Sequence, residues 1–171
     1  MGKVKLLLIV AVFITPFIFA QYFSMSNVTD TRGTTNHGVF LSEEITITPK
    51  IQAEDEYWII LQVLPSICDK KCKDNTHMLR QINTALGKDM GRVVRYILSK
   101  DNSSKQYNHL NNYPKVIVLE DSETLYNKLT KMDERIFIAD PFGKIILGYN
   151  QDFLAKGLLK DLKKLLKYSK I

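Results

Sequence analysis

The sequence has few cysteines and no surplus of charge over its central part. Two cysteines among 171 residues can form one disulfide at most, which excludes a small scaffold held together by several bridges. The net charge of +6 is confined to the ends, because residues 24–151 carry equal numbers of basic and acidic side chains. A neutral body argues against a nucleic-acid-binding surface spread over the domain, so we expect no nucleic-acid partner.

Glycine and proline are also sparse, with eight and five residues, which excludes a collagen-like chain. Hydrophobic residues make up 45% of the sequence, too many for a disordered protein. The composition therefore predicts one globular domain of ordinary size.

The longest apolar stretch lies near the N-terminus, at residues 6–23, where Thr15 and Gln21 are the only polar residues. As a helix, this stretch would be about 27 Å long, close to the hydrocarbon thickness of a bilayer. Lys3 and Lys5 precede it, so the positive-inside rule predicts a cytoplasmic start and an exported remainder. We expect residues 1–23 to form a cytoplasmic start followed by one transmembrane helix.

A cleaved signal peptide is the alternative for the same stretch. Signal peptidase prefers small residues at positions −3 and −1, and Ala20 could occupy −1 while Ile18 would then occupy −3. Both possibilities export the rest of the chain into a compartment where a cysteine pair can be oxidised. The sequence favours the anchor and leaves cleavage open.

The exported part reads as a polar linker, residues 24–39, followed by one domain, residues 40–171. Strands and helices alternate along this domain, which predicts an α/β fold: a mixed sheet with helices on both faces. The expected strands are 45–48, 57–64, 93–98, 115–119 and the two arms of a hairpin within 135–149; the expected helices begin near Cys72, near Ser122 and near Leu154.

Chemistry is expected at Cys68 and Cys72, which form a C-x-x-x-C pair between the buried strand 57–64 and the following helix. A thiol at a helix N-terminus lies near unpaired backbone N–H groups, which favour the thiolate, and Lys70 and Lys71 would add to this. A thiolate is both the nucleophile of disulfide exchange and a soft metal ligand. The pair could therefore be a redox-active dithiol, a Cu(I) site, or a structural disulfide that pins a loop to its helix.

The order strand, C-x-x-x-C, helix, strand, and then the IADPFGK hairpin with a terminal helix resembles the thioredoxin-like superfamily. Within it, the chain resembles the membrane-anchored Sco/SenC-type proteins of cytochrome c oxidase assembly and their smaller anchored bacterial relatives. The resemblance implies that Cys68 and Cys72 supply two copper ligands and a redox-active dithiol. It also implies a bacterial inner-membrane location, with the domain in the periplasm and an oxidase subunit or another exported thiol protein as partner.

The family's third copper ligand is a histidine just before the D-P-x-G hairpin, and residues 130–135 contain none. Met132 is the nearest soft donor there, and His37 could fold back over the site, whereas His77 should face away from the thiols. Three hypotheses follow: an oxidase assembly factor that delivers Cu(I) or maintains thiols, a general thiol–disulfide oxidoreductase, and a non-catalytic adaptor. We favour the first.

Overall fold

The computed structural model describes residues 2–25, 35–47, 57–100, 116–119 and 123–169, without the side chains of residues 6–10, 20 and 22–25. The chain divides into two compact units, residues 1–35 and 36–171. The second unit begins four residues before the predicted start of the domain at residue 40, because residues 36–39 contact its last helix and its sheet.

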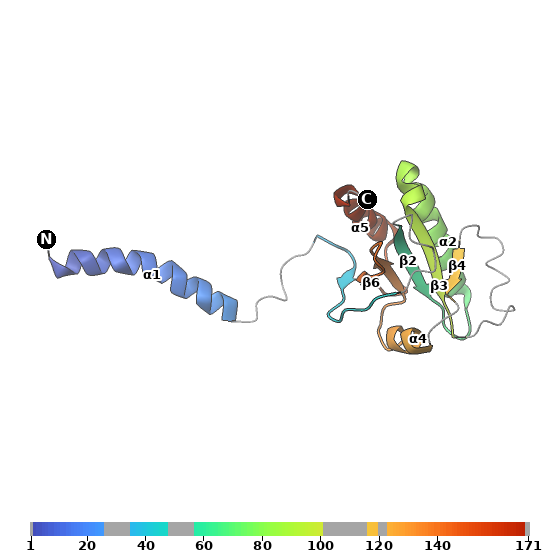
Figure 1. Cartoon of the computed structure of the whole chain (residues 1–171), viewed down its shortest axis with the longest axis horizontal. Helices are drawn as coiled ribbons and strands as arrows, with labels where there is room; N and C mark the ends of the chain where they lie inside the picture. The colour runs from blue at the N-terminus through green and yellow to red at the C-terminus, as the bar shows by residue number, and fades with distance from the viewer. Residues whose placement is uncertain (1, 26–34, 48–56, 101–115, 120–122, 170–171) are drawn as a thin grey trace. The chain divides into compact units, whose positions relative to one another are not determined.

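The first unit contains helix α1 (Lys3–Met25), which includes the whole apolar stretch and Pro16 (Figure 1). Within the described part of the chain, no helix meets the combined length and hydropathy required to cross a bilayer.

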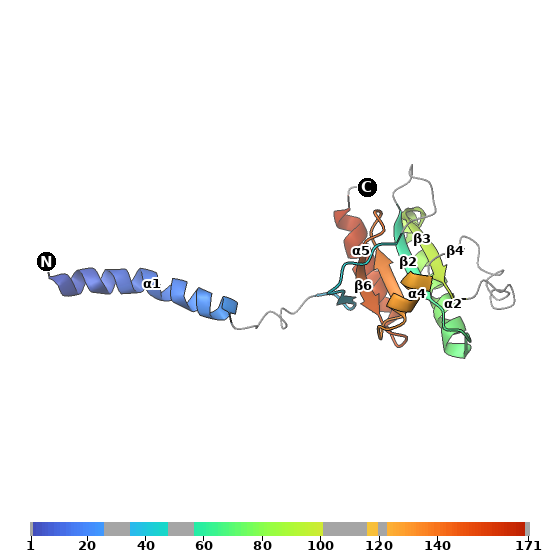
Figure 2. The ribbon, with the colours of Figure 1, turned by 60° about the horizontal axis from the view of Figure 1, so that its bottom comes forward.

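The second unit is built on a six-stranded mixed sheet with the order β1-β6-β5-β2-β3-β4 (Figure 1 and Figure 2). β2, β3 and β4 run parallel, while β5, β6 and β1 pair antiparallel. The central strand β2 is buried along its whole length. The strand bounds are β1 (Val39–Phe40), β2 (Trp58–Val63), β3 (Val93–Leu98), β4 (Val116–Leu119), β5 (Ile136–Ala139) and β6 (Ile145–Tyr149).

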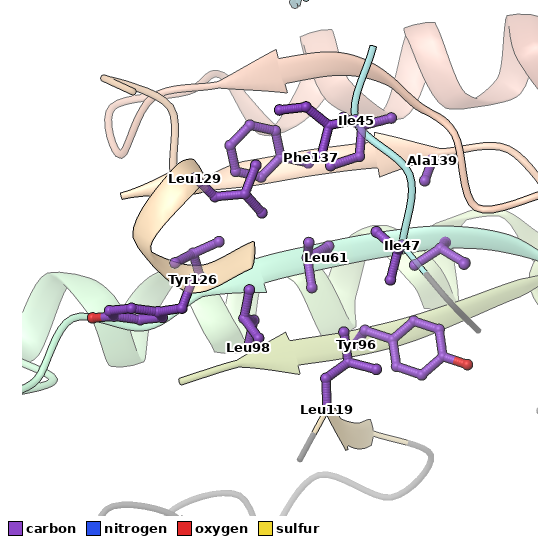
Figure 3. Close-up of a cluster of buried hydrophobic side chains, with 13 residues drawn as sticks. Ile45, Ile47, Leu61, Tyr96, Leu98, Leu119, Tyr126, Leu129, Phe137 and Ala139 are labelled. Carbon is purple, nitrogen blue, oxygen red and sulfur yellow. The ribbon is translucent and has the colours of Figure 1, made fainter. Parts of the chain in front are cut away.

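Helices cover both faces of this sheet, as predicted. Residues of α2 (Lys70–Ala85) and α5 (Ala155–Tyr168) pack on one face, in a cluster that includes Leu79, Ile82, Leu158 and Leu162. On the other face, Tyr126 and Leu129 of α4 (Glu123–Leu129) lie over Leu61 and Phe137 (Figure 3). A 3₁₀ helix, η2 (Gly87–Arg92), connects α2 to β3.

The predicted hairpin turn at residues 140–143 is confirmed. The backbone N–H of Gly143 donates to the carbonyl of Asp140 at 2.9 Å, and Gly143 has a φ of 85°, which glycine adopts at little cost. The edge strand predicted at 45–48 is instead a single bridge between Thr46 and Lys144, and residue 48 lies outside the described residues. The sheet ends on β1, where only two residues pair with β6.

Candidate functional site

The cysteine pair lies at the C-terminal end of the central strand. After β2, the N–H of Leu64 continues the parallel pairing by donating to the carbonyl of Leu98 at 2.8 Å. The chain then leaves the sheet through residues 65–67 and enters α2 at Asp69, the N-cap residue. This route places Cys68 before the helix and Cys72 in its first turn, as the sequence predicted.

Cys68 and Cys72 form a disulfide, with their Cα atoms 5.3 Å apart. This separation lies inside the range of about 4.4–6.8 Å that disulfides occupy. The two residues differ in burial: Cys72 is 4% exposed and packs with Leu64 and Ile97, whereas Cys68 is half-buried at the edge of the same cluster. Cys68 is therefore the more exposed residue of the pair.

The first turn of α2 is capped by a carboxylate. The Oδ1 atom of Asp69 accepts a hydrogen bond of 2.8 Å from the N–H of Cys72. The carboxylate of Asp69 thus accepts a hydrogen bond from one of the backbone N–H groups at the helix N-terminus. The sequence had predicted that these N–H groups would favour the thiolate. Lys71, which was expected to add positive charge, forms an ion pair with the exposed Asp152.

Two buried polar residues that the sequence analysis missed hold Cys72 in place. The side-chain amide of Gln62 donates to the carbonyl of Cys72 at 3.2 Å. The hydroxyl of Thr76 lies 3.0 Å from Gln62 Oε1 and 3.0 Å from the same carbonyl. A glutamine inside an otherwise apolar strand, ten residues before a cysteine, is the signal that could have found this network, because a buried amide needs partners.

The described contacts of the candidate third donors are with residues other than the cysteines. The loop that ends at Arg135 reaches the same end of the sheet, since the N–H of Val63 donates to the carbonyl of Arg135 at 2.8 Å. The side chain of Met132, however, packs against the cluster under α4, whereas Cys68 and Cys72 belong to the cluster around Leu64.

Both described histidines contact side chains other than the cysteines. The ring of His37 lies 3.2 Å from Asp161 of α5. His77 is exposed on α2, as expected, and its Nε2 lies 3.0 Å from the side-chain nitrogen of Gln81. His109 lies outside the described residues.

The donors that the described residues bring together therefore fit a site of two thiolates. No group of three or more His, Cys, Asp or Glu side chains converges anywhere in the part of the chain that the structure describes. Two cysteine sulfurs, once reduced, are a suitable donor set for the soft Cu(I) ion. The same two sulfurs are also sufficient for dithiol–disulfide exchange.

With this geometry, the domain defines a thioredoxin-like protein: a central parallel strand, a cysteine pair at the start of the next helix, and an antiparallel hairpin beyond. Residues 58–169 match the family model described as "Transmembrane-like, thioredoxin-like, C-terminal domain", and the chain belongs to this family. No curated protein matches the chain.

Solved structures share the fold at low sequence identity. The copper-bound ScoI of Arabidopsis thaliana is 16% identical, with a TM-score of 0.54 over 67% of this chain and 87% of that one. The copper-bound Sco1 of yeast is 14% identical, with a TM-score of 0.55 over 67% and 81%. A yeast mitochondrial 1-Cys peroxiredoxin is 13% identical, with a TM-score of 0.50 over 66% and 65%. The fold thus resembles that of Sco proteins and is shared with a peroxiredoxin, so the fold alone does not select the chemistry.

Proposed function

We propose that this chain is a membrane-anchored, exported protein whose Cys68–Cys72 pair assists the assembly of a cytochrome oxidase by thiol–disulfide exchange. The observation that supports this proposal most strongly is the unequal exposure of two linked cysteines at a helix start. An inert disulfide of this kind would add little stability, because it closes a loop of only a few residues. The Sco-like fold supports the choice of an oxidase subunit as client.

The exchange step uses both cysteines in a fixed order. In the reduced protein, the thiolate of Cys68 attacks one sulfur of a client disulfide, and the other client sulfur leaves as a thiolate. Cys72 then attacks the sulfur of Cys68, which releases the second client thiol and forms the Cys68–Cys72 disulfide. The client gains two electrons and the protein loses two, so an exported dithiol reductant must restore the reduced pair. In this scheme the network of Gln62 and Thr76 positions Cys72 for the second attack.

A trapping experiment tests this order. Full-length Cys72→Ser, which keeps the more exposed cysteine, should accumulate a mixed disulfide with its client that survives acid quenching. Cys68→Ser is the matched control, because it keeps only the buried cysteine and should trap little. Equal trapping by both variants would contradict the assigned order, and no trapping by either variant would leave the adaptor hypothesis.

Cu(I) delivery is the second candidate function, because two thiolates suit this ion. In this reading Cys68 and Cys72 hold one Cu(I), with Met132 as a candidate third donor from the neighbouring loop. A competition titration of the reduced full chain against a Cu(I) chelator tests it. Binding should be lost in Cys68→Ser and Cys72→Ser, modestly weakened in Met132→Leu, and unchanged in His77→Ala. If the wild type takes up no copper while its disulfide still exchanges, Cu(I) delivery is excluded and thiol–disulfide exchange remains as the proposed function.

Residues 6–23 are proposed to anchor the protein in a bacterial inner membrane, with the domain in the periplasm. The support is the apolar sequence with its two preceding lysines. Protease added to intact spheroplasts should degrade the domain. Protection of the domain, while a known periplasmic protein is cut, would contradict this topology.

A further inference from the structure

The exposed charge of α5 is entirely positive. Its five lysines are all exposed, whereas its single acid, Asp161, is 2% exposed and turned into the domain. Four of the lysines follow the spacing i, i+4, i+7, i+11, which places them in one stripe about 60° wide on the helix. We call these four residues the basic stripe: Lys156, Lys160, Lys163 and Lys167.

The C-terminal end of the basic stripe borders an open cavity of about 540 Å³ between α5 and η2. Lys88 adds another exposed cation to the lining. Arg92 fixes the wall, because its guanidinium donates to the carbonyls of Leu166 at 3.1 Å and Ser169 at 2.9 Å and pairs with Asp89 at 3.3 Å. Asp89 is the only acid in this lining, so the cavity carries a clear positive excess.

Several exposed cations around one cavity are a suitable set of donors for a phosphate group. Next to the cavity in sequence, Tyr168 is 73% exposed and lies under the ammonium of Lys167, an arrangement suited to a membrane interface.

The tether from the N-terminal segment enters the domain on this same helix. Asp161 accepts hydrogen bonds from the N–H groups of His37 at 2.7 Å and Gly38 at 3.0 Å, and Lys164 contacts Asn36 at 3.5 Å. Ten residues, 26–35, join α1 to this point, and they can span about 36 Å at most when fully extended. If residues 6–23 lie in a membrane, the segment that follows them is bonded to α5 through residues 37 and 38.

We propose that the basic stripe and the cavity at its end bind the phosphate groups of anionic phospholipids in the membrane that holds the chain's own anchor. This inference rests on the proposed anchoring through residues 6–23. It gives the domain a preferred orientation, in which α5 faces the bilayer. Each lysine close to an anionic surface adds to the attraction, and salt weakens it.

The test compares the full chain reconstituted in vesicles of neutral phosphatidylcholine and in vesicles with about 30% phosphatidylglycerol. Acetylation of individual lysines is followed by mass spectrometry. The basic-stripe lysines and Lys88 should react at least about threefold more slowly in the anionic vesicles, and about 1 M salt should abolish the difference. Lys131, which follows α4 on the other face of the sheet, should react equally in both.

A variant pair sharpens the result. The triple variant Lys160→Gln, Lys163→Gln, Lys167→Gln should lose the protection of Lys88, whereas Lys70→Gln, Lys73→Gln, Lys131→Gln should keep it. Equal reactivity of Lys88 in both lipids for the wild type would overturn the proposal. Equal protection by inorganic phosphate in neutral vesicles would also overturn it, because the site would then bind free phosphate.

Flotation with the neutral vesicles separates the two proposals. If the chain floats with neutral vesicles but its lysines react equally in both lipids, the anchor holds and the proposal that α5 faces the bilayer is wrong. A chain that does not float with them contradicts the anchor itself.

Discussion

Two short segments of this protein are fastened to helices on the same face of the sheet, by different means. Before α2, Cys68 is joined to Cys72 by a covalent bond between positions four residues apart. At α5, residues 37 and 38 are held by the carboxylate of Asp161, more than 120 residues away. The first contact is a covalent bond with one partly exposed residue, whereas the second is a set of hydrogen bonds to a buried carboxylate.

The difference separates an accessible bond from an enclosed one. Asp161 accepts from two backbone N–H groups and from the hydroxyl of Tyr149 at 2.9 Å, so every polar group of the contact has a partner. A buried carboxylate with this many donors stabilises the fold. The cysteine pair lacks such enclosure on one side, because Cys68 is half-buried and the preceding Ile67 is 84% exposed. The disulfide is therefore partly open to solvent, whereas the carboxylate is enclosed.

Removal of the buried carboxylate should have the largest effect on stability. Asp161→Ala leaves two backbone N–H groups and the Tyr149 hydroxyl without their acceptor, and should cost about 3 kcal/mol in the free energy of unfolding. Chemical unfolding of the full chain measures this. Asp152→Ala is the control, because this carboxylate is exposed and pairs with Lys71 on the surface, and it should cost less than about 1 kcal/mol. Similar losses in both variants would contradict the buried role.

Acid should weaken the hydrogen bonds that Asp161 of α5 accepts from residues 37 and 38. Burial by itself raises the pKa of Asp161, but the N–H groups of Gly38 and His37, the Tyr149 hydroxyl and the His37 ring donate to the carboxylate and together lower it below its usual value. Because the pKa in the folded state is the lower one, the stabilisation is complete above about pH 5 and is lost progressively as the pH falls through the unfolded and then the folded pKa.

Unfolding midpoints of the wild type and Asp161→Asn between about pH 2 and pH 7 check this prediction. The wild type should lose more stability than the variant on the acid side, while the two curves should run in parallel above about pH 5. Parallel curves over the whole range would show that the carboxylate does not titrate as described.

The network behind Cys72 should contribute less to stability. Thr76→Val keeps the side-chain volume but leaves Gln62 Oε1 without its donor, and should cost about 1 kcal/mol in the free energy of unfolding. Thr84→Val on the same helix removes a similar bond, from the Thr84 hydroxyl to the carbonyl of Arg80, at an exposed position. This control should cost about 0.5 kcal/mol or less, and equal costs would argue against a role for the buried network.

The smallest effect concerns the rate of exchange. Asp69→Asn keeps a side-chain oxygen for the N–H of Cys72 but removes a negative charge beside the pair. The thiolate of Cys68 should then be favoured, and the reduced protein should react about threefold faster with a model disulfide at neutral pH. Stopped-flow rates for the wild type and Asp69→Asn measure the change, with Asp74→Asn as the control on the next turn. A slower Asp69→Asn would show that the cap, and not the charge, governs the rate.

The sequence predicted the local features of the site and missed the long-range ones. The position of Cys68 and Cys72 directly after a buried strand was enough to predict a cysteine pair at a helix start, because the two residues are only four positions apart. The hairpin turn at residues 140–143 was predictable for the same reason. The contact between His37 and Asp161 was not, since an acid in a lysine-rich helix looks like a solvated residue until the fold brings His37, Gly38 and Tyr149 to it.

The edge strand at 45–48 was predicted from its alternating pattern, but pairing depends on the partner strand, which here offers a single bridge at Lys144. The packing of Met132 against the cluster under α4 likewise depends on tertiary contacts, which sequence spacing does not contain.

The most direct test of the proposed chemistry is to identify which sulfur of the Cys68–Cys72 disulfide accepts an incoming thiol. The oxidised full chain is exposed briefly to glutathione, quenched with acid, and mapped by mass spectrometry for the mixed disulfide. Attack at the half-buried Cys68, with Cys72 as the leaving thiolate, should place most of the glutathione on Cys68. Glutathione mainly on Cys72, or a disulfide that does not react in its folded state, would contradict the assignment of this pair as the working thiols of the protein.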